Sequence, residues 1–305
     1  MMVLRSAVSK VRIDSLVFSP DGTALAAPAG VSGVMLWTTL ANNAKAEMLR
    51  LPVAVNHLCF SPDGLTLFAG NDQICAFNLT DRTATRLTIP AYATLRFAVT
   101  LGGDYLIVAE NPRGTEQTRL TVWATDSLSQ PVSEVISASY VRMPPIFLPD
   151  GDRFILVEDN RQPSLQWEFR CVHRSVNTGT VLNRSDPLVD APELAAMSTD
   201  GLMLACRTRQ VIRIYPTTVP WSDVPTIGND SQKHFTGVAF HPNNKYLAAT
   251  SNDTTVKLYD TTTWNVVRAF TWDIGRMRSI AFSPDGTLAA AGSDSGKVVV
   301  WDVDL

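Results

Sequence analysis

Short apolar segments alternate with polar turn residues along the whole chain. The phrase Phe-Ser-Pro-Asp-Gly occurs three times, starting at Phe18, Phe60 and Phe282, and each copy separates one apolar segment from the next. Proline sets φ at the first central turn position, while Asp-Gly supplies a side-chain hydrogen bond and a residue that tolerates positive φ. Each phrase therefore predicts a tight turn between two antiparallel strands.

Four further segments occupy the same place in the pattern with altered turn residues, starting at Val99, Phe147, Met197 and Phe240. The seven anchors are 42, 39, 48, 50, 43 and 42 residues apart. A second strand follows each anchor, then a polar turn, a third strand that usually ends in an aromatic residue, and a fourth strand. Seven repeats of four short strands predict an all-β fold, a seven-bladed β-propeller with four antiparallel strands per blade.

The spacing of the repeats also predicts how the two ends of the chain meet. From each third-strand aromatic to the next anchor the spacing is 22 to 25 residues, and joining Trp301 through the ends to Phe18 gives 22. We therefore expect a strand at about Met2 to Val8 to form the outer strand of the last blade, which removes an exposed sheet edge. Residues 1–305 are predicted to form one propeller domain.

The ends of the third strands carry a resemblance to a known family. Trp301-Asp302 and Tyr259-Asp260 match the Trp-Asp pair of WD40 repeats, and with the turn phrases the resemblance covers the whole chain. It implies a WD40-type propeller that binds other proteins.

The chain also departs from the pattern of that family. Trp272-Asp273 stands where the family has Gly-His, although Asp253 keeps the family's Asp in the sixth blade. The buried Asp-His-Ser-Trp hydrogen-bond network of the family is therefore expected to be largely missing. We expect apolar packing to hold the blades together instead.

The third and fourth repeats are longer than the others because of additional residues between their second and third strands. These segments, Glu110–Arg119 and Glu158–Glu168, are predicted to be loops that form a wall on one face. Trp167 is interpreted either as a partner contact or as a strand residue packed between blades. Neutral drift of surface loops explains the same insertions equally well.

The WD40 resemblance implies that positions eight and six residues before each turn proline contact partners at the mouth of the central channel. From these positions, together with Trp167, we select eight predicted channel-face residues. They are Arg12, Asp14, Met143, Trp167, Glu193, His234, Arg276 and Arg278.

Arginines dominate this face where the last and first blades are expected to meet. Arg12, Arg276 and Arg278 could hold an acidic peptide or a phosphate through two-pronged hydrogen bonds. The alternative is a solvated charge network in which they pair with Asp14, Asp273 and Asp294. Leu95, Val141 and Met143 are expected to form an apolar side of the same mouth.

Composition narrows the classes of function. A net charge of −3 argues against a nucleic-acid-binding surface, which is usually basic. No segment has the length of a membrane span or the core of a secretion signal, so we expect a cytoplasmic protein that does not bind a membrane. The four cysteines lie in apolar segments without metal-ligand spacing, which indicates buried, reduced thiols.

No convergent set of catalytic groups is visible in the sequence. The four histidines lie on different strands or turns, the Asp-Gly pairs are explained by turn geometry, and no glycine-rich phosphate loop is present. We therefore expect no enzyme activity, cofactor or metal, and a protein that is monomeric by itself and acts as an interaction scaffold. The alternatives are a propeller enzyme or small-ligand binder that uses the channel, and a structural subunit that uses another face.

Overall fold

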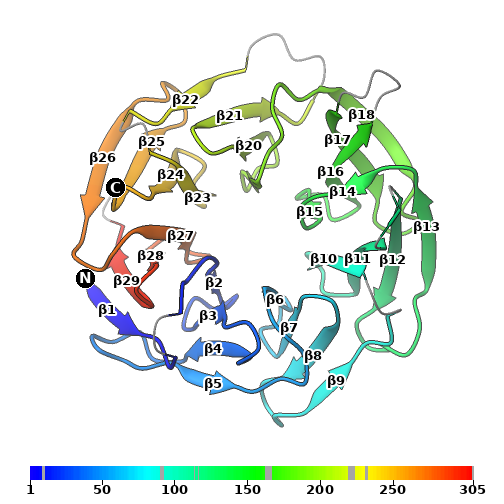
Figure 1. Ribbon diagram of the computed structural model, residues 1–305, viewed down its shortest axis with the longest axis horizontal. Coiled ribbons are helices and arrows are strands. Elements are labelled where there is room, and N and C mark those ends of the chain that lie inside the picture. The colour runs from blue at the N-terminus through cyan, green and yellow to red at the C-terminus, as the bar shows by residue number, and fades with distance from the viewer. Residues whose placement is uncertain are drawn as a thin grey trace. The chain divides into compact units, whose positions relative to one another are not determined.

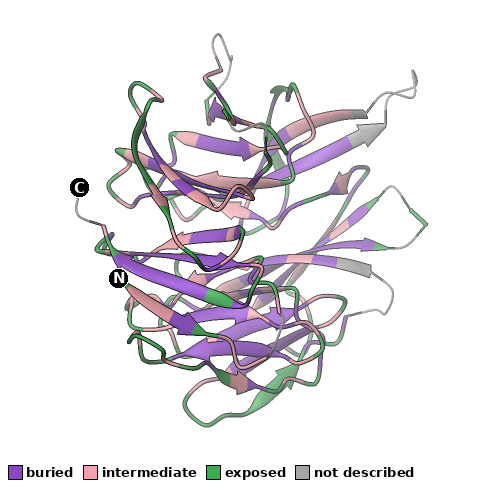
Figure 2. Ribbon diagram, turned by 60° about the vertical axis from the view of Figure 1, so that its left-hand side comes forward, coloured by how far each residue is buried: buried purple, intermediate pink, exposed green. Residues whose placement is uncertain are grey.

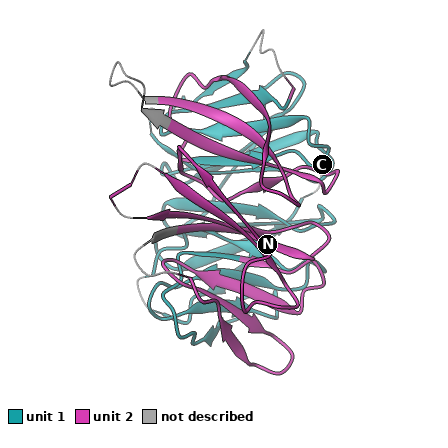
Figure 3. Cartoon of the chain, turned by 90° about the vertical axis from the view of Figure 1, so that its right-hand side faces the viewer, with its two compact units in different colours: residues 1–58, 194–217, 223–305 teal, residues 59–193, 218–222 magenta. Residues whose placement is uncertain are grey.

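The computed structural model describes residues 1–8, 11–89, 93–112, 114–115, 117–161, 167–218, 224–230 and 233–303. The elements in these residues are β-strands joined by turns, and they form seven sheets (Figure 1). The chain divides into two compact units, drawn in teal and magenta in Figure 3. Unit 1 comprises residues 1–58, 194–217 and 223–305, and unit 2 comprises residues 59–193 and 218–222.

Unit 1 contains four of the sheets. The first has the order β2 (Val17–Phe18), β3 (Leu25–Pro28), β4 (Val34–Trp37) and β5 (Glu47–Leu49). The next two are β19 (Leu194–Met197), β20 (Met203–Arg207), β21 (Val211–Pro216) and β22 (Thr226–Gly228), then β23 (Phe235–Phe240), β24 (Tyr246–Ser251), β25 (Thr255–Asp260) and β26 (Val266–Thr271). The last has the order β1 (Met2–Arg5), β29 (Lys297–Asp302), β28 (Leu288–Ser293) and β27 (Met277–Phe282).

Unit 2 begins within the first strand of its first sheet. That sheet consists of β6 (His57–Phe60), β7 (Thr66–Gly70), β8 (Ile74–Asn78) and β9 (Ala84–Arg86). The second consists of β10 (Ala93–Val99), β11 (Tyr105–Pro112), β12 (Thr118–Ala124) and β13 (Ser133–Ser137). In the third, β14 (Tyr140–Val141) and β15 (Ile146–Phe147) both pair with β16 (Arg153–Arg161), which is followed by β17 (Trp167–Ser175) and β18 (Val181–Pro187).

The seven antiparallel sheets are the blades of a seven-bladed β-propeller, which confirms the predicted fold class. The predicted role of the N-terminal strand is also confirmed, because β1 pairs with β29 in a register from Met2 opposite Val300 to Arg5 opposite Lys297. Both strands lie side by side within unit 1 (Figure 1). That residues 1–305 form one domain stays a prediction.

The turn phrases fold as their chemistry predicts. In the first copy, the Ser19 hydroxyl donates to the Asp21 carboxylate and accepts the amide of Ala24, while Gly22 has a φ of 72°. The copies at Ser61 and Ser283 repeat this pattern. These hydrogen bonds hold the pKa of Asp21 below its usual value, the one from Ser19 having the largest effect.

Buried residues concentrate on the middle strands of the blades (Figure 2). Their apolar side chains form clusters between neighbouring blades within each unit. Between the sixth and the last blade, Trp301 packs against Trp272 with ring centroids 4.7 Å apart, and Phe270 on β26 stacks on Trp272 at 5.5 Å. The Trp301 indole nitrogen has no hydrogen-bond partner among the described residues. Aromatic packing therefore occupies the place of the family's polar network here, as the sequence predicts.

The third and fourth blades differ from the prediction in how they use their additional residues. Strands β11 and β12 have 8 and 7 residues, and β16 and β17 have 9 each, whereas the second and third strands of the other blades have 4 to 6. The insertions were expected as loops, but residues 110–112 and 118–119 of the first and residues 158–161 and 167–168 of the second lie in strands that pair with their neighbours. The longer hairpins satisfy their backbone groups by pairing, which exposed loops would leave to water.

Candidate functional site

Three of the predicted channel-face residues meet on the surface of unit 1. Arg278 donates from Nε to Oδ1 of Asp14 over 2.9 Å, and Nη2 of Arg12 lies 3.2 Å from Oδ2 of the same carboxylate. The side chains of Arg12, Asp14 and Arg278 are 61%, 49% and 24% exposed. One carboxylate thus holds two guanidinium groups together, and neither group makes another hydrogen bond within the described residues. We call Arg12, Asp14, Arg278 and the neighbouring Arg276 the arginine cluster.

The residue between Arg12 and Asp14 fixes this cluster to the last blade. Ile13 is fully buried, its amide donates to the Ser293 carbonyl over 3.0 Å, and its carbonyl accepts the Ser279 hydroxyl over 2.7 Å. A Cβ atom on Gly292 would lie 2.4 Å from the Ile13 side chain, so this strand position requires glycine. The cluster is therefore held by its backbone as well as by its ion pairs.

Arg276 and His234 occupy equivalent places in neighbouring blades of unit 1. The Arg276 amide donates to a carboxylate oxygen of Asp294, whose own amide donates to the Arg276 carbonyl. His234 and Asn252 form the same two bonds, each 3.0 Å long. Both side chains, Arg276 and His234, are exposed. No hydrogen bond or ion pair joins His234 to the arginines in the described part of unit 1.

The alternative drawn from the sequence is that the arginines pair with Asp14, Asp273 and Asp294. Of these three carboxylates, Asp14 pairs with both Arg12 and Arg278. Asp294 instead bonds the main chain of Arg276. Within the described residues, no carboxylate oxygen lies within 4 Å of the Arg276 guanidinium. The cluster therefore combines internal ion pairs with a third arginine that is open to solvent.

The remaining predicted residues lie in unit 2. Met143 is only 4% exposed, and Leu95 and Val141 are also buried, so the expected apolar side of the mouth is not an exposed surface in this structure. These side chains pack inside the unit because apolar area is most stable away from water. Glu193 is exposed and precedes β19. Trp167 begins β17 opposite Arg161, and its side chain lies outside the described part of the chain.

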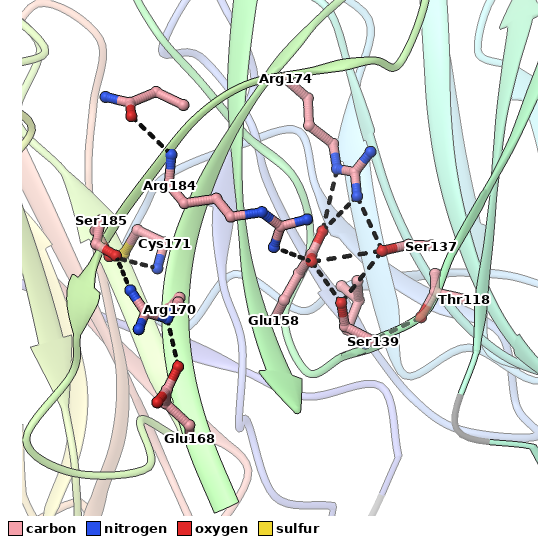
Figure 4. Close-up of polar contacts among 12 residues, drawn as sticks. Thr118, Ser137, Ser139, Glu158, Glu168, Arg170, Cys171, Arg174, Arg184 and Ser185 are labelled. Carbon is pink, nitrogen blue, oxygen red and sulfur yellow. Dashed lines mark hydrogen bonds and ion pairs between the residues drawn. The ribbon is translucent and has the colours of Figure 1, made fainter. Parts of the chain in front are cut away.

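Unit 2 contains a buried ionic network that the sequence analysis missed. Glu158 on β16 is 1% exposed and pairs with Arg174 on β17, which is 3% exposed, at 2.7 Å (Figure 4). The other carboxylate oxygen accepts the Ser139 hydroxyl over 2.6 Å and lies 3.5 Å from Arg184. Arg174 also donates to Ser137 on β13, so the network crosses from the third blade to the fourth.

Two further buried acids lie on the long hairpins. Asp159 pairs with Arg142 at 2.5 Å, and the Arg142 guanidinium lies 5.0 Å from the centre of the Phe169 ring. Glu110 pairs with Arg119 at 2.6 Å on the neighbouring hairpin. These pairs correct the expectation that apolar packing mainly holds all the blades. A buried carboxylate needs a cationic partner, and each of these acids has one.

The buried cysteines are not activated as nucleophiles. Burial raises the pKa of Cys171 to about 12 and that of Cys75 to about 11, so both thiols are protonated at neutral pH and are poor nucleophiles. All four cysteines are free, and three of them are buried. No three His, Cys, Asp or Glu side chains in the described residues gather as they would around a metal ion.

Comparison with known proteins gives the family of two segments. Residues 224–260 and 267–302 match the WD40 family, described as WD domain, G-beta repeat. The first matched segment contains β22, the outer strand of one blade, and three strands of the next blade; the second contains most of β26 and three strands of the last blade. The protein is thus a seven-bladed β-propeller that contains WD40 repeats, as the sequence resemblance indicates.

WD40 propellers commonly serve as scaffolds for protein interactions and are typically not enzymes. No curated protein matches the chain by sequence. In the described part of the chain, no helix has the length and apolar character needed to cross a membrane.

Proposed function

We propose that this protein is a non-catalytic interaction module that binds an acidic segment of another protein at the arginine cluster. The observation that carries the proposal is the arrangement of Arg12 and Arg278 around Asp14, with Arg276 two residues before Arg278. At neutral pH these four side chains sum to a charge of about +2. Such a surface on a chain of net charge −3 favours an anionic partner segment.

The ion pairs of Asp14 orient two guanidinium groups of the cluster and leave most of their N–H donors available to a partner. An arginine has five N–H donors, and Asp14 is bonded by one nitrogen of Arg278 and lies beside one nitrogen of Arg12. Partner carboxylates can therefore add to the free donors of guanidinium groups that are already oriented. Orientation before binding reduces the loss of side-chain entropy on association.

The lack of catalysis, the monomeric state and a cytoplasmic location belong to the same proposal. The support for a non-catalytic role is the WD40 match together with thiols that are protonated at neutral pH. The cytoplasmic location rests on the sequence argument given above.

Selection of peptides from a random display library on the immobilised full-length chain tests the proposal. We expect selected peptides to be rich in Asp and Glu and to lose at least tenfold in affinity when Arg12, Arg276 and Arg278 are all changed to Glu. The matched control reverses three other exposed arginines, Arg50, Arg86 and Arg153, and should change affinity less than threefold. Selected peptides that bind both triple variants equally would overturn the proposed site.

A further inference from the structure

Arg96 lies half-buried in unit 2, at the junction between the third and fourth blades of the propeller. Its Nε donates to the Arg142 carbonyl over 2.9 Å, and its Nη1 donates to its neighbour's carbonyl, Leu95, over 3.0 Å. A guanidinium group has five N–H donors, so three remain. Within the described residues the structure provides no acceptor for these three, and no carboxylate oxygen lies within 4 Å.

In unit 1, the equivalent contact between the last blade and the first is made by a neutral side chain. Ser279 stands five residues before the turn proline of its blade, as Arg96 stands five before Leu101, which takes the place of that proline. Ser279 donates to the Ile13 carbonyl over 2.7 Å. Ile13 and Arg142 both stand seven residues before the turn prolines of the blades that follow, so the two bonds are equivalent. A hydroxyl group is therefore sufficient to join two blades at this position.

Partial burial of a positive charge at this position is unfavourable, and the contact between the blades does not need the charge. Burial lowers the pKa of Arg96, because removal from water disfavours the charged guanidinium. The nearby Arg142 differs, since Asp159 neutralises it and the Phe169 ring lies beside it. Arg96 is held instead by two uncharged carbonyls, and its charge is not balanced by any described carboxylate at contact distance.

We infer that Arg96 is an anion-binding residue that receives a carboxylate or phosphate group of a bound protein segment. Its two main-chain bonds fix the plane of the guanidinium group, and the three remaining donors suffice for a contact of two hydrogen bonds with one oxyanion. The inference rests on the proposed function in one respect, that a protein segment supplies the anion. Arg96 in unit 2 would then be a second residue that binds an anionic group, in addition to the arginine cluster in unit 1.

Nuclear magnetic resonance of the arginine side chains in the full-length chain tests the anion site directly. Sodium acetate and inorganic phosphate are titrated separately at constant ionic strength, and the Arg96 resonance is assigned by its loss in Arg96→Gln. We expect it to shift with saturation for at least one anion, at concentrations at which Arg153, already paired with Asp150, does not saturate. Which anion saturates it distinguishes a carboxylate from a phosphate. Shifts that match those of Arg153 for both anions would overturn the inference.

Variants then connect the site to peptide binding. Arg96→Ser retains a donor of the kind that Ser279 uses, Arg96→Gln retains a longer neutral donor, and Arg96→Lys retains the charge. We expect Gln and Ser to weaken the selected acidic peptides about tenfold and Lys to weaken them less, with thermal unfolding midpoints close to that of the wild type.

The outcomes separate this inference from the proposed function. If the triple reversal in unit 1 abolishes peptide binding and Arg96→Gln leaves it within twofold, the inference is wrong and the proposed function stands. If Arg96 saturates with an anion but no acidic peptide is selected, the anion site stands and the proposed function is wrong. Should a variant fail to fold, the titration of the wild-type chain still decides.

Discussion

Two junctions between neighbouring blades differ in their chemistry, one being made by neutral groups and the other by buried charges. Between the last blade and the first, in unit 1, Ser279 bonds the Ile13 carbonyl and Gly292 leaves space for the Ile13 side chain. Between the third and fourth blades, in unit 2, Glu158 and Arg174 are buried together and reach Ser137 on the neighbouring blade. Four-stranded blades thus tolerate either neutral close packing or buried charge at their contacts, provided that a fully buried charge has a partner of opposite sign.

The two junctions also differ in how well sequence patterns describe them. The segments that match WD40 repeats include the last two blades of unit 1, where aromatic packing dominates. No match falls on the first four blades, and two of these, the third and fourth, have long hairpins and buried ion pairs. We expect substitutions at the junction in unit 2 to lower stability by leaving a buried charge without its partner. Substitutions at the junction in unit 1 should lower stability by changing the volume of packed side chains.

The largest effect is expected from Glu158→Ala. Removing this carboxylate leaves the Arg174 guanidinium buried without its ionic partner, which should lower the free energy of unfolding by about 3–5 kcal/mol. Urea unfolding of the full-length chain measures the change. The control is Glu134→Ala, because Glu134 is a half-exposed partner of Arg119 at 4.0 Å and should change stability by about 0.5 kcal/mol or less. Equal losses in the two variants would show that the buried pair does not hold the junction.

In unit 1 the corresponding effect should come from an apolar side chain. Leu4 on β1 is fully buried in the cluster that includes Val298 and Val300, so Leu4→Ala should cost about 2–5 kcal/mol in the free energy of unfolding. The measurement is made at low and at high salt, and we expect the same loss in both. A loss that depends strongly on salt would contradict the contrast between the units.

A smaller effect is expected from Gly292→Ala, which adds one methyl group where Ile13 already lies too close for it. Overpacking at this position should cost about 1–3 kcal/mol and should also weaken acidic peptides, because Ile13 positions Arg12 and Asp14. Gly228→Ala is the matched control, since a Cβ atom there would meet nothing within 4 Å. If both variants keep wild-type stability and affinity, Gly292 does not fix the arginine cluster.

The smallest effect concerns pH. Burial lowers the pKa of His173 below its usual value of 6.5, so the unfolded chain takes up a proton at a higher pH than the folded chain. The stability that depends on the neutral ring is complete above about pH 6.5 and is lost as the pH falls toward the lower folded pKa. His173→Phe should therefore lose less stability than the wild type between pH 7.5 and 5.5, measured by denaturant unfolding. Identical losses would exclude His173 as the source.

Local chemistry made most of the fold predictable. The Ser-Pro-Asp-Gly turns at Ser19, Ser61 and Ser283 depend on residues within five positions of one another, so the sequence alone indicates them. The pairing of β1 with β29 was found by counting spacings. The arginine cluster was predictable in part because the WD40 resemblance implies that the positions of Arg12, Asp14 and Arg278 lie on the channel face.

The buried network was not predictable in the same way. Glu158 and Asp159 are adjacent acids in a segment that resembles a surface insertion, and only the extended pairing of β16 with β17 places them inside the unit. Their partners are distant in the chain, with Arg174 and Ser139 separated from Glu158 by 16 and 19 residues. The one local signal was the apolar Phe154–Val157 segment directly before the two acids, which indicates a strand that continues into them.

The pairing of β1 with β29 has a consequence for how the chain folds. Met2 and Val300 are partners at almost the largest sequence separation that the chain allows, so the blade they share depends on a very long loop closure. Non-local contacts of this kind slow folding more than they reduce stability. Until β1 docks, the outer edge of β29 is an unpaired strand that can recruit other chains. Aggregation during refolding should therefore depend on how quickly the amino-terminal strand arrives, even in variants whose final stability is unchanged.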